Sequence, residues 1–461
     1  MRAQASTRCF NATRDPAPLT PTPCDSMPEE TSTPFPLEPR LQNRNALIYA
    51  TQISMTYLGA PALYIGFVQA GLCKHLDTSN TIANLPSSVF LSMVWVAVVV
   101  AWLFPQARML KTVLTSSYKF MAAANAMVAI VLCANLSREF IVGALIVHAA
   151  VVGAANGVIN VLGWEVLSRG VSLRARGKAL ALAFGWGPAF AVLGSLGAQL
   201  LLNGELFHWV PPTWLTVLYP YNYALLFALS TASMALAAYL TRLYHIPLPE
   251  VEAERGDFFS DMKESLRSFL SHRILLIASV AYLLVYCGNM VQNNMSLFTQ
   301  EAVGRMPEEL AGYQLVLRFS FKMLCGFFLG WLLVRTNPKT PLLITIGLQI
   351  AGVLWVLFVP GYWFLLAFGI NGAGELFGVY YMNYPMECSA KSHVRRNLAF
   401  MSVLSTLVGL SPVFYGWVSD TWNLRASFWA ALALLLFTAV MVIVKLPANP
   451  QPPTEDGPEK A

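Results

Sequence analysis

The sequence predicts an all-α membrane protein of twelve transmembrane helices, arranged as two pseudo-symmetric six-helix bundles. The first observation is the composition, because 56% of the 461 residues are hydrophobic and only 12% are charged, about half the charged share of an average soluble domain. The second is a series of apolar runs of about 20 residues, each long enough to cross the hydrocarbon core as a helix. The third is a polar stretch, residues 243–273, that divides these runs into two sets of six.

Each apolar run is interpreted as one membrane-spanning helix. The spans are expected at residues 46–71, 88–104, 113–134, 140–164, 179–202 and 221–242, then 274–299, 313–334, 341–359, 361–384, 398–418 and 427–445. The domains that follow are an N-terminal bundle over residues 45–242 and a C-terminal bundle over residues 274–446. Residues 1–44 and 447–461 are polar and proline-rich without an apolar period, which predicts disordered tails.

The polar stretch at residues 243–273 contains apolar side chains at helical spacing. This pattern predicts an amphipathic helix that lies on the membrane surface. Its apolar positions are Phe258, Phe259, Met262, Leu266, Phe269 and Leu270.

The distribution of basic residues among the short loops predicts the orientation of the chain, because cytoplasmic loops carry an excess of lysine and arginine. The loops after the even-numbered spans carry most of these residues, and the opposite loops carry only Lys74, Arg138, Arg305 and Arg425. With an even number of spans, both termini and the central linker are expected in the cytoplasm. The net charge of +6 therefore reflects membrane orientation, and binding to nucleic acid is not expected.

A short internal repeat supports two related halves. The fourth span contains Gly153-Ala154-Ala155-Asn156 and the tenth contains Gly372-Ala373-Gly374-Glu375. Arg176 and Arg395 follow these motifs at the same distance, in basic loops. Divergent repeats of this kind are typical of duplicated transporter folds.

The layout over residues 45–446 resembles the major facilitator superfamily. The resemblance implies a cytoplasmic gate at the basic loops, and Arg174-Ala175-Arg176-Gly177-Lys178 is similar to a signature of the family. The loop after the second span, residues 104–111, keeps only the basic character of the family's gate motif, and the loop at residues 330–339 keeps a glycine and a basic residue but lacks the aspartate. The gate residues expected by this resemblance are Arg108, Arg174, Arg176, Arg335 and Arg395.

Three ionisable residues stand out inside apolar runs, where a charge is costly and therefore indicates function. Arg318 and Lys322 are one helical turn apart on the eighth span, and Glu375 lies near the middle of the tenth. Since the resemblance places both helices beside a central cavity, the cations can bind an anionic group of a substrate, and Glu375 can carry a proton. The alternative is a static pair of Lys322 and Glu375, with Arg318 directed toward the outer interface.

Polar side chains on the spans that the resemblance places around the cavity form a second set of candidates. Asn289, Gln292 and Asn293 share one helical face of the seventh span, so they can hydrogen-bond a polar solute or, alternatively, neighbouring helices. With the charged residues, the predicted substrate-binding set is Tyr57, Asn156, Asn160, Tyr286, Asn289, Gln292, Asn293, Arg318, Lys322, Asn371, Glu375 and Tyr380.

These features predict a carrier that moves a small polar organic solute across the membrane by alternating access, either coupled to protons through Glu375 or facilitative. We expect a monomer in the lipid bilayer with no cofactor and no metal, since His148 has no second ligand at metal spacing. No catalytic motif indicates an enzyme. The alternative function is a transporter-derived sensor or scaffold that moves no solute. The amide and tyrosine lining favours a sugar-like or nucleoside-like solute, whereas Arg318 and Lys322 favour an organic anion.

Overall fold

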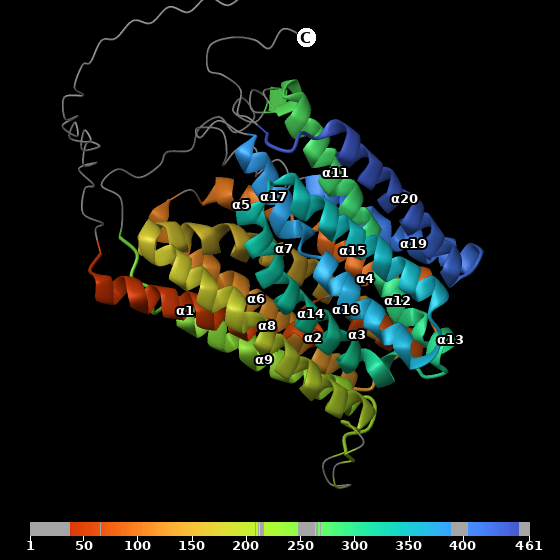
Figure 1. The fold of residues 1–461 in the computed structure, drawn as a ribbon. Helices are drawn as coiled ribbons and strands as arrows, with labels where there is room; N and C mark the ends of the chain where they lie inside the picture. The colour runs from red at the N-terminus through yellow and green to blue at the C-terminus, as the bar shows by residue number, and fades with distance from the viewer. Residues whose placement is uncertain are drawn as a thin grey trace, which may run out of the picture. The chain divides into compact units, whose positions relative to one another are not determined.

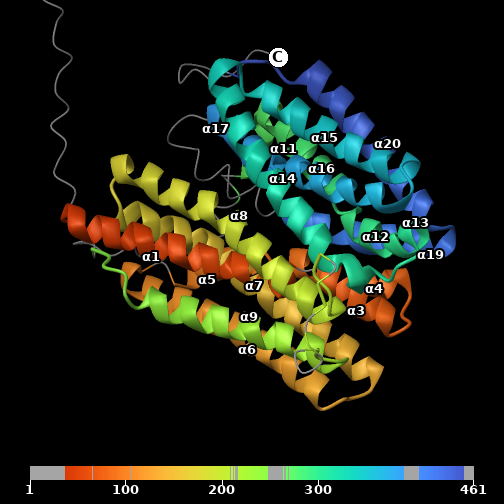
Figure 2. The same cartoon turned by 60° about the horizontal axis from the view of Figure 1, so that its bottom comes forward.

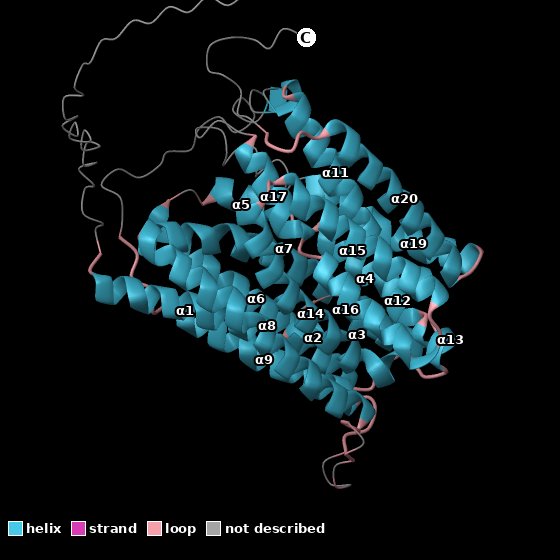
Figure 3. Cartoon of the chain, viewed as in Figure 1, coloured by secondary structure: helices cyan, strands magenta, loops and turns pink. Residues whose placement is uncertain are grey.

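The computed structural model describes residues 37–450, except residues 65, 105, 208, 211, 213–215, 248–262, 264–265, 268 and 389–403. Helices and the loops between them make up this part of the chain, and the bridge between Leu206 and Trp209 is its one strand-like pairing (Figures 1 and 3). The amphipathic helix predicted in the central linker lies largely outside the described residues. So do the tails before residue 37 and after residue 450.

The first half of the chain supplies the helices that correspond to the first six predicted spans. They are α1 (Pro39–Leu58), α2 (Ala60–Leu63), α3 (Phe67–His75), α4 (Asn80–Ser92), α5 (Val96–Leu103), η1 (Ala107–Met109), α6 (Leu110–Cys133), α7 (Arg138–Gly170), α8 (Leu173–Asn203) and α9 (Tyr221–Thr241).

The second half supplies the helices of the last six predicted spans. They are α11 (Arg273–Asn289), α12 (Gln292–Leu297), α13 (Thr299–Val303), α14 (Pro307–Arg335), α15 (Lys339–Phe358), η3 (Gly361–Leu365), α16 (Leu366–Gly374), α17 (Phe377–Glu387), η4 (Ser405–Gly409), α19 (Leu410–Thr421) and α20 (Leu424–Lys445).

Eight segments of the described chain are helical, apolar and long enough to cross a membrane by themselves. The remaining helices occupy the predicted first, fifth, tenth and eleventh spans, so the described helices account for each of the twelve. The predicted fold class is confirmed.

Several helices begin earlier than the apolar runs predicted, and α1 and α4 do so by the most residues. Helix α1 starts at Pro39, a residue favoured in the first turn of a helix, so residues 39–44 are not part of the tail. Helix α4 starts at Asn80 because the Ser79 side chain accepts a hydrogen bond from the Ile82 backbone N–H at 3.3 Å. The prediction of a span beginning at residue 88 missed this polar first part.

Four of the described spans are interrupted, and one of them is the second span, between Ser92 and Val96. The first is divided at Gly59 and again before Phe67, beside Pro61 and Gly66. The seventh is interrupted after Asn289, and the tenth between Gly374 and Phe377. Glu375 lies in this last interruption, which the sequence did not predict. Interrupted helices expose backbone polar groups, and in membrane proteins they are tolerated beside a cavity or buried within the protein.

Buried apolar side chains form three clusters, and their membership shows where the two halves meet. One cluster draws only on residues 46–244 and another only on residues 269–446. The third contains residues of both halves, including Phe67 of α3 with Phe319 of α14 and Phe368 of α16. The halves therefore share a core near α3, α12 and α14, where the views show their helices close together (Figure 2).

Two pairs of helices make the most extensive contacts between the halves, α4 with α19 and α8 with α14. These helices belong to the second and eleventh spans and to the fifth and eighth spans, so the six-helix repeat relates one pair to the other. Small residues allow the close approach, because a Cβ added at Gly312 of α14 would lie against Gln199 Cβ and 2.6 Å from the Ser195 carbonyl oxygen of α8. These contacts lie at the end of the helices where the chain passes through loops 76–79, 204–220, 304–306 and 422–423. We call this end of the protein the closed end.

Candidate functional site

A cavity of about 400 Å³ lies between the two halves. Its walls come from α1, α4, α6 and α7 of the first half and from α11, α12, α14 and the α16–α17 interruption of the second. Every hydrogen bond found between the halves among the described residues lies at the closed end or beside the cavity. The lining of the cavity extends from there toward the opposite end, as far as Tyr49, Leu114 and Trp164. Loops 104–106, 171–172 and 336–338 lie at that end, and we call it the open end.

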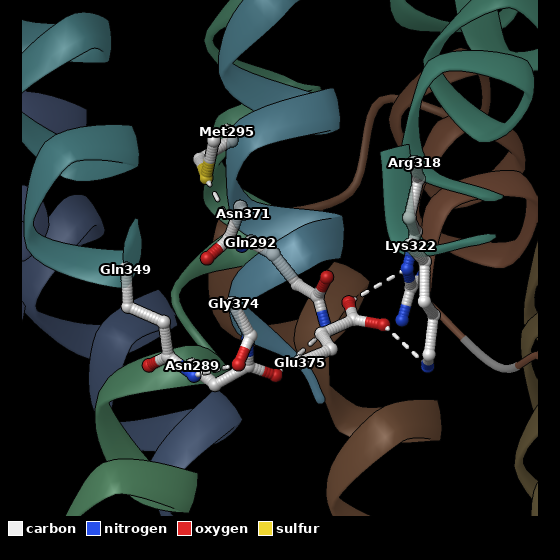
Figure 4. Close-up of polar contacts among 9 residues, drawn as sticks. All are labelled: Asn289, Gln292, Met295, Arg318, Lys322, Gln349, Asn371, Gly374 and Glu375. Atoms are coloured by element: carbon white, nitrogen blue, oxygen red, sulfur yellow. Dashed lines mark hydrogen bonds and ion pairs between the residues drawn. The ribbon is translucent and has the colours of Figure 1, made fainter. Parts of the chain in front are cut away.

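One carboxylate and two cations meet on the C-terminal side of the cavity (Figure 4). The Arg318 Nε atom lies 2.7 Å from Glu375 Oε1, and the Lys322 Nζ atom lies 3.1 Å from Glu375 Oε2. The Glu375 side chain is 6% exposed, that of Arg318 10% and that of Lys322 21%. We call these three residues the charged triad. Since Arg318 binds Glu375, the alternative in which it points to the outer interface is wrong for this conformation.

The Arg318 guanidinium also contacts aromatic rings of the other half. Its Cζ atom lies 4.9 Å from the centre of the Phe67 ring on α3 and 5.8 Å from that of Tyr64. A cation over the face of an aromatic ring is attracted by the ring quadrupole. Arg318 therefore links the triad to both halves.

Close packing of α14 against α16 holds the triad together. A Cβ added at Gly372 would lie 2.7 Å from the Arg318 Cα atom and against its carbonyl oxygen. Only a residue without a side chain allows this approach. Because Glu375 follows three residues later, the contact places its carboxylate within reach of both cations.

The amide side chains of the interrupted seventh span line the same cavity. Gln292 Nε2 donates to Asn289 Oδ1 at 3.3 Å, and Asn293 lines the wall beside them. Asn294 points elsewhere: its Nδ2 atom donates to Ser419 Oγ and Ser427 Oγ, and its Oδ1 atom accepts from Asn84 Nδ2 at 2.8 Å. Asn294 thus forms the interhelical network that was the alternative for this group, whereas the other amides face the cavity.

Ten of the twelve predicted substrate-binding residues line the cavity: Tyr57, Asn156, Asn160, Tyr286, Asn289, Gln292, Asn293, Arg318, Lys322 and Glu375. Two do not. Asn371 contacts Met295 Sδ at 3.8 Å in a buried layer behind the cavity wall, because the helix turns its face toward α12 and α15. Tyr380 belongs to the apolar core of the second half, because the interruption after Gly374 rotates α17 relative to α16.

Further aromatic rings line the cavity beside the predicted Tyr57 and Tyr286. They are Tyr64, Tyr282 and Phe377, and the sequence contained no signal for the last two. The Tyr57 and Tyr64 rings are stacked with centres 6.0 Å apart, and the Tyr286 and Phe377 rings meet edge to face at 5.3 Å. An aromatic residue in an apolar run is not distinguished by hydropathy from a lipid-facing one, so only its position relative to Tyr57 and Tyr286 could have indicated this role.

Helix α4 receives its cap at the closed end from the other half. Asp420 of α19 accepts hydrogen bonds from the backbone N–H groups of Asn80 at 2.9 Å and Thr81 at 2.8 Å. Burial alone would raise the pKa of Asp420, but the hydrogen bonds from Thr81 and Asn80 outweigh it and hold this pKa below its usual value. An ionised side chain at a helix N-terminus is stabilised by the helix dipole as well.

A histidine bridges the halves at the same end. His75 Nδ1 lies 3.0 Å from Glu308 Oε1, with the His75 side chain 38% exposed and that of Glu308 13%. The hydrogen bond to Glu308 raises the pKa of His75 above its ordinary value; burial opposes this shift, and the charges of Glu308 and Asp77 add to it. The Tyr219 ring packs on the imidazole at 4.5 Å.

This bridge predicts that the closed end depends on pH. Because the contact raises the His75 pKa, its stabilising contribution is complete below the ordinary value of about 6.5 and is lost as the pH rises through the raised value. Spin labels at Leu136→Cys and Trp363→Cys, exposed positions on the two halves, measure the separation of the halves at this end. We expect a larger open fraction at about pH 9 than at about pH 6.

Two single substitutions of histidine by glutamine provide the test and its control. His75→Gln should remove the pH dependence, and His245→Gln, at an exposed position remote from the bridge, should leave it intact. An unchanged pH response in His75→Gln would assign the effect to another group.

The structure describes the side chains of two of the five predicted gate residues, Arg108 and Arg335. Arg335 is exposed and its Cζ atom lies 4.5 Å from the centre of the Trp331 ring. Arg108 is exposed near the start of α6, whereas the Arg174 and Arg176 side chains and all of Arg395 lie outside the described residues. Both placed residues are at the open end, and their gate role stays a prediction.

The sequence and the fold were compared with known proteins. Residues 279–461 match the family model described as Major Facilitator Superfamily, and no curated protein sequence matches the chain. Among solved structures, a mutant of the nucleoside transporter NupG has a TM-score of 0.64 at 12% identity, covering 87% of this chain and 99% of that one.

Two further structures are similar over nearly the same residues. A D-xylose–proton symporter has a TM-score of 0.64 at 13% identity and covers 88% of this chain and 98% of its own. A bacterial homolog of the human lysosomal transporter Spinster, in an inward-facing and unoccupied conformation, has a TM-score of 0.59 at 13% identity and covers 88% and 96%. At these identities the structures show the fold, and with the family match they confirm the resemblance predicted from the sequence.

Proposed function

We propose that this solute transporter with the major facilitator fold moves a small polar organic solute by alternating access and binds it in the cavity between its two halves. The chain is an integral, multi-pass membrane protein, and its activity is transport rather than catalysis. The ten predicted residues that line the cavity form the proposed binding site. We propose further that it works as a monomer.

The charged triad in a cavity between two helical halves is the observation that carries this proposal. Ionisable groups at membrane depth are costly, and they are retained where they face a pathway and bind a solute or an ion. The cavity is of the size of small-molecule sites. A purely structural ion pair would not need access to a cavity, whereas all three members of the triad line it.

The closed and open ends assign a state to the transport cycle. If the basic loops are cytoplasmic, as their charge predicts, the open end faces the cytoplasm and the structure is inward-facing. The halves would then separate at the α4–α19 and α8–α14 contacts to open the other end. Rocking of two halves around a central site is how such carriers alternate their access.

Glu375 is the proposed site of proton coupling. Protonation would remove one negative charge and release Arg318 and Lys322 from their partner, so that proton binding and solute binding at the triad become linked. Facilitative transport without protons is the alternative. A difference in uptake with and without an imposed proton gradient separates the two.

Counterflow into proteoliposomes tests transport itself. Vesicles preloaded with unlabelled uridine, xylose, glycylglycine or levulinate are given the labelled form of the same solute outside. We expect transient accumulation of at least one of these probes, and none in empty vesicles.

A pair of neighbouring substitutions serves as the control. Asn160→Trp should abolish the counterflow, because residue 160 lines the cavity, whereas Val161→Trp, at an exposed position of α7 outside the cavity wall, should not. Counterflow that survives Asn160→Trp would place the path elsewhere. The absence of flux for every probe would favour the sensor or scaffold function.

A further inference from the structure

The charges around the cavity do not cancel. Among the described residues that line it, Arg318, Lys322 and Glu375 are the only ones with ordinarily ionised side chains. Two cations and one carboxylate leave an excess of one positive charge when all three are ionised. Such an excess in a membrane-embedded site is costly unless an anion approaches it.

Lys322 is the member of the triad whose spare donors are best placed for a ligand. An ammonium group has three donors, and among the described residues the Glu375 carboxylate is its one hydrogen-bond acceptor. Its side chain is also the most exposed of the three, at 21%. Arg318 is enclosed by Phe67 and Tyr64, and both Glu375 oxygens are occupied by the two cations. Glu375 Oε1 lies in an ion pair without accepting a hydrogen bond, but the two cations carry more N–H donors than the one carboxylate has acceptor sites. The triad therefore presents mainly donors to a ligand.

The amides of the seventh span offer donors as well. The Nδ2 atoms of Asn289 and Asn293 are buried without a hydrogen-bond partner, in residues that are 3% and 4% exposed and line the cavity. For Asn289 the donor is defined by its neighbour, because Gln292 Nε2 occupies the Asn289 Oδ1 acceptor (Figure 4). A buried donor without a partner is costly, so both positions fit a ligand with acceptor oxygens.

We propose that the solute is a small organic monoanion whose carboxylate faces Lys322 and whose remaining acceptor oxygens are held by Asn289 and Asn293. A carboxylate accepts hydrogen bonds only and neutralises the excess charge. The stacked Tyr57 and Tyr64 rings on one side, and Tyr286 with Phe377 on the other, fit an apolar body between them. This inference rests on the proposed function, since it names the solute class of the same site.

Pairs of probes that differ only in charge test it. Benzoate with benzamide, lactate with lactamide, and levulinate with levulinamide keep the skeleton and exchange the carboxylate for a neutral amide. Binding to the purified full chain is measured from the shift of its thermal unfolding with probe concentration, since a ligand stabilises the state that binds it. We expect at least one carboxylate to bind on the order of tenfold or more tightly than its amide.

Substitutions that alter the charge count make the test specific. Lys322→Gln should remove the preference for the carboxylate, Lys322→Arg should keep it, and Lys119→Gln, which removes an exposed lysine of the spanning helix α6 outside the cavity wall, should leave it unchanged. The double variant Lys322→Gln with Glu375→Gln again has one excess positive charge, so part of the preference should return. Lys322→Arg also guards against a result caused by misfolding.

The outcomes separate this inference from the proposed function. Equal affinity within every pair, or stabilisation by uridine and xylose but by no carboxylate, would overturn the monoanion proposal while counterflow of those neutral solutes would leave the carrier function standing. The absence of binding for all of the carboxylate probes would also overturn the monoanion proposal. If no probe crosses the membrane, the carrier function fails as well.

Discussion

Replacing Glu375 by glutamine is expected to abolish accumulation of the solute against its gradient and to remove the pH dependence of uptake. The substitution keeps the size of the side chain but removes the carboxylate that both cations contact at 2.7 and 3.1 Å. A side chain that cannot bind and release a proton cannot couple a proton gradient to transport. Exchange of solute at equal pH on both sides needs no net proton movement, so counterflow should persist in this variant.

The measurement is uptake into proteoliposomes with and without an imposed proton gradient, using the probe that shows counterflow. Glu165→Gln is the matched control, because Glu165 also lies on a spanning helix and pairs with Arg169 at 2.8 Å, outside the cavity wall. Full uphill uptake with its normal pH dependence in Glu375→Gln would show that Glu375 carries no coupled proton.

Replacing Gly312 by alanine is expected to shift the protein toward conformations in which the closed end is open. The added Cβ would meet Gln199 Cβ and the Ser195 carbonyl oxygen of α8, and neither the main chain nor a Cβ can move aside without shifting a helix. Overpacking of this kind costs about 1–3 kcal/mol, which is enough to alter a balance between two transport states. Solute flux should fall because the cycle requires the closed end to form.

Spin labels at Leu136→Cys and Trp363→Cys, in a background without the seven native cysteines, report this change as a longer distance population. Gly326→Ala is the control on the same helix, because the nearest atom to its added Cβ is Leu376 Cδ1 at 4.0 Å. Identical distance distributions in Gly312→Ala and wild type would mean that the α8–α14 contact does not limit closure.

The sequence was sufficient for the fold class and for most of the cavity because membrane depth makes polar residues conspicuous. Lys322, Glu375 and the amides of the seventh span stand out in apolar runs, and the resemblance to the superfamily implied that their spans line the cavity. Their exact partners were not predictable. Whether Arg318 would point outward or bind Glu375 depends on the approach of α14 to α16 at Gly372, a packing detail that hydropathy does not contain.

Two of the predicted residues, Asn371 and Tyr380, do not line the cavity in this structure. The interruption between Gly374 and Phe377 separates Tyr380 from the part of the tenth span that carries Glu375, and hydropathy does not show such an interruption. The early start of α4 has a related origin, because residues 80–87 include Asn80, Thr81 and Asn84, which lower the hydropathy although they contact the other half. Polar residues that serve contacts between the halves resemble loop residues in a hydropathy profile.

The cap that Asp420 places on α4 makes the transport cycle depend on the solvation of one helix end. While the closed end is shut, the first backbone N–H groups of α4 donate hydrogen bonds to the Asp420 side chain of α19. When the halves separate, water must form hydrogen bonds with these N–H groups and with the Asp420 carboxylate, since a helix terminus without hydrogen-bond partners is costly. Each opening of this end therefore includes the hydration of this junction, and we expect conditions that lower water activity to hold the transporter in the conformation in which this end is shut.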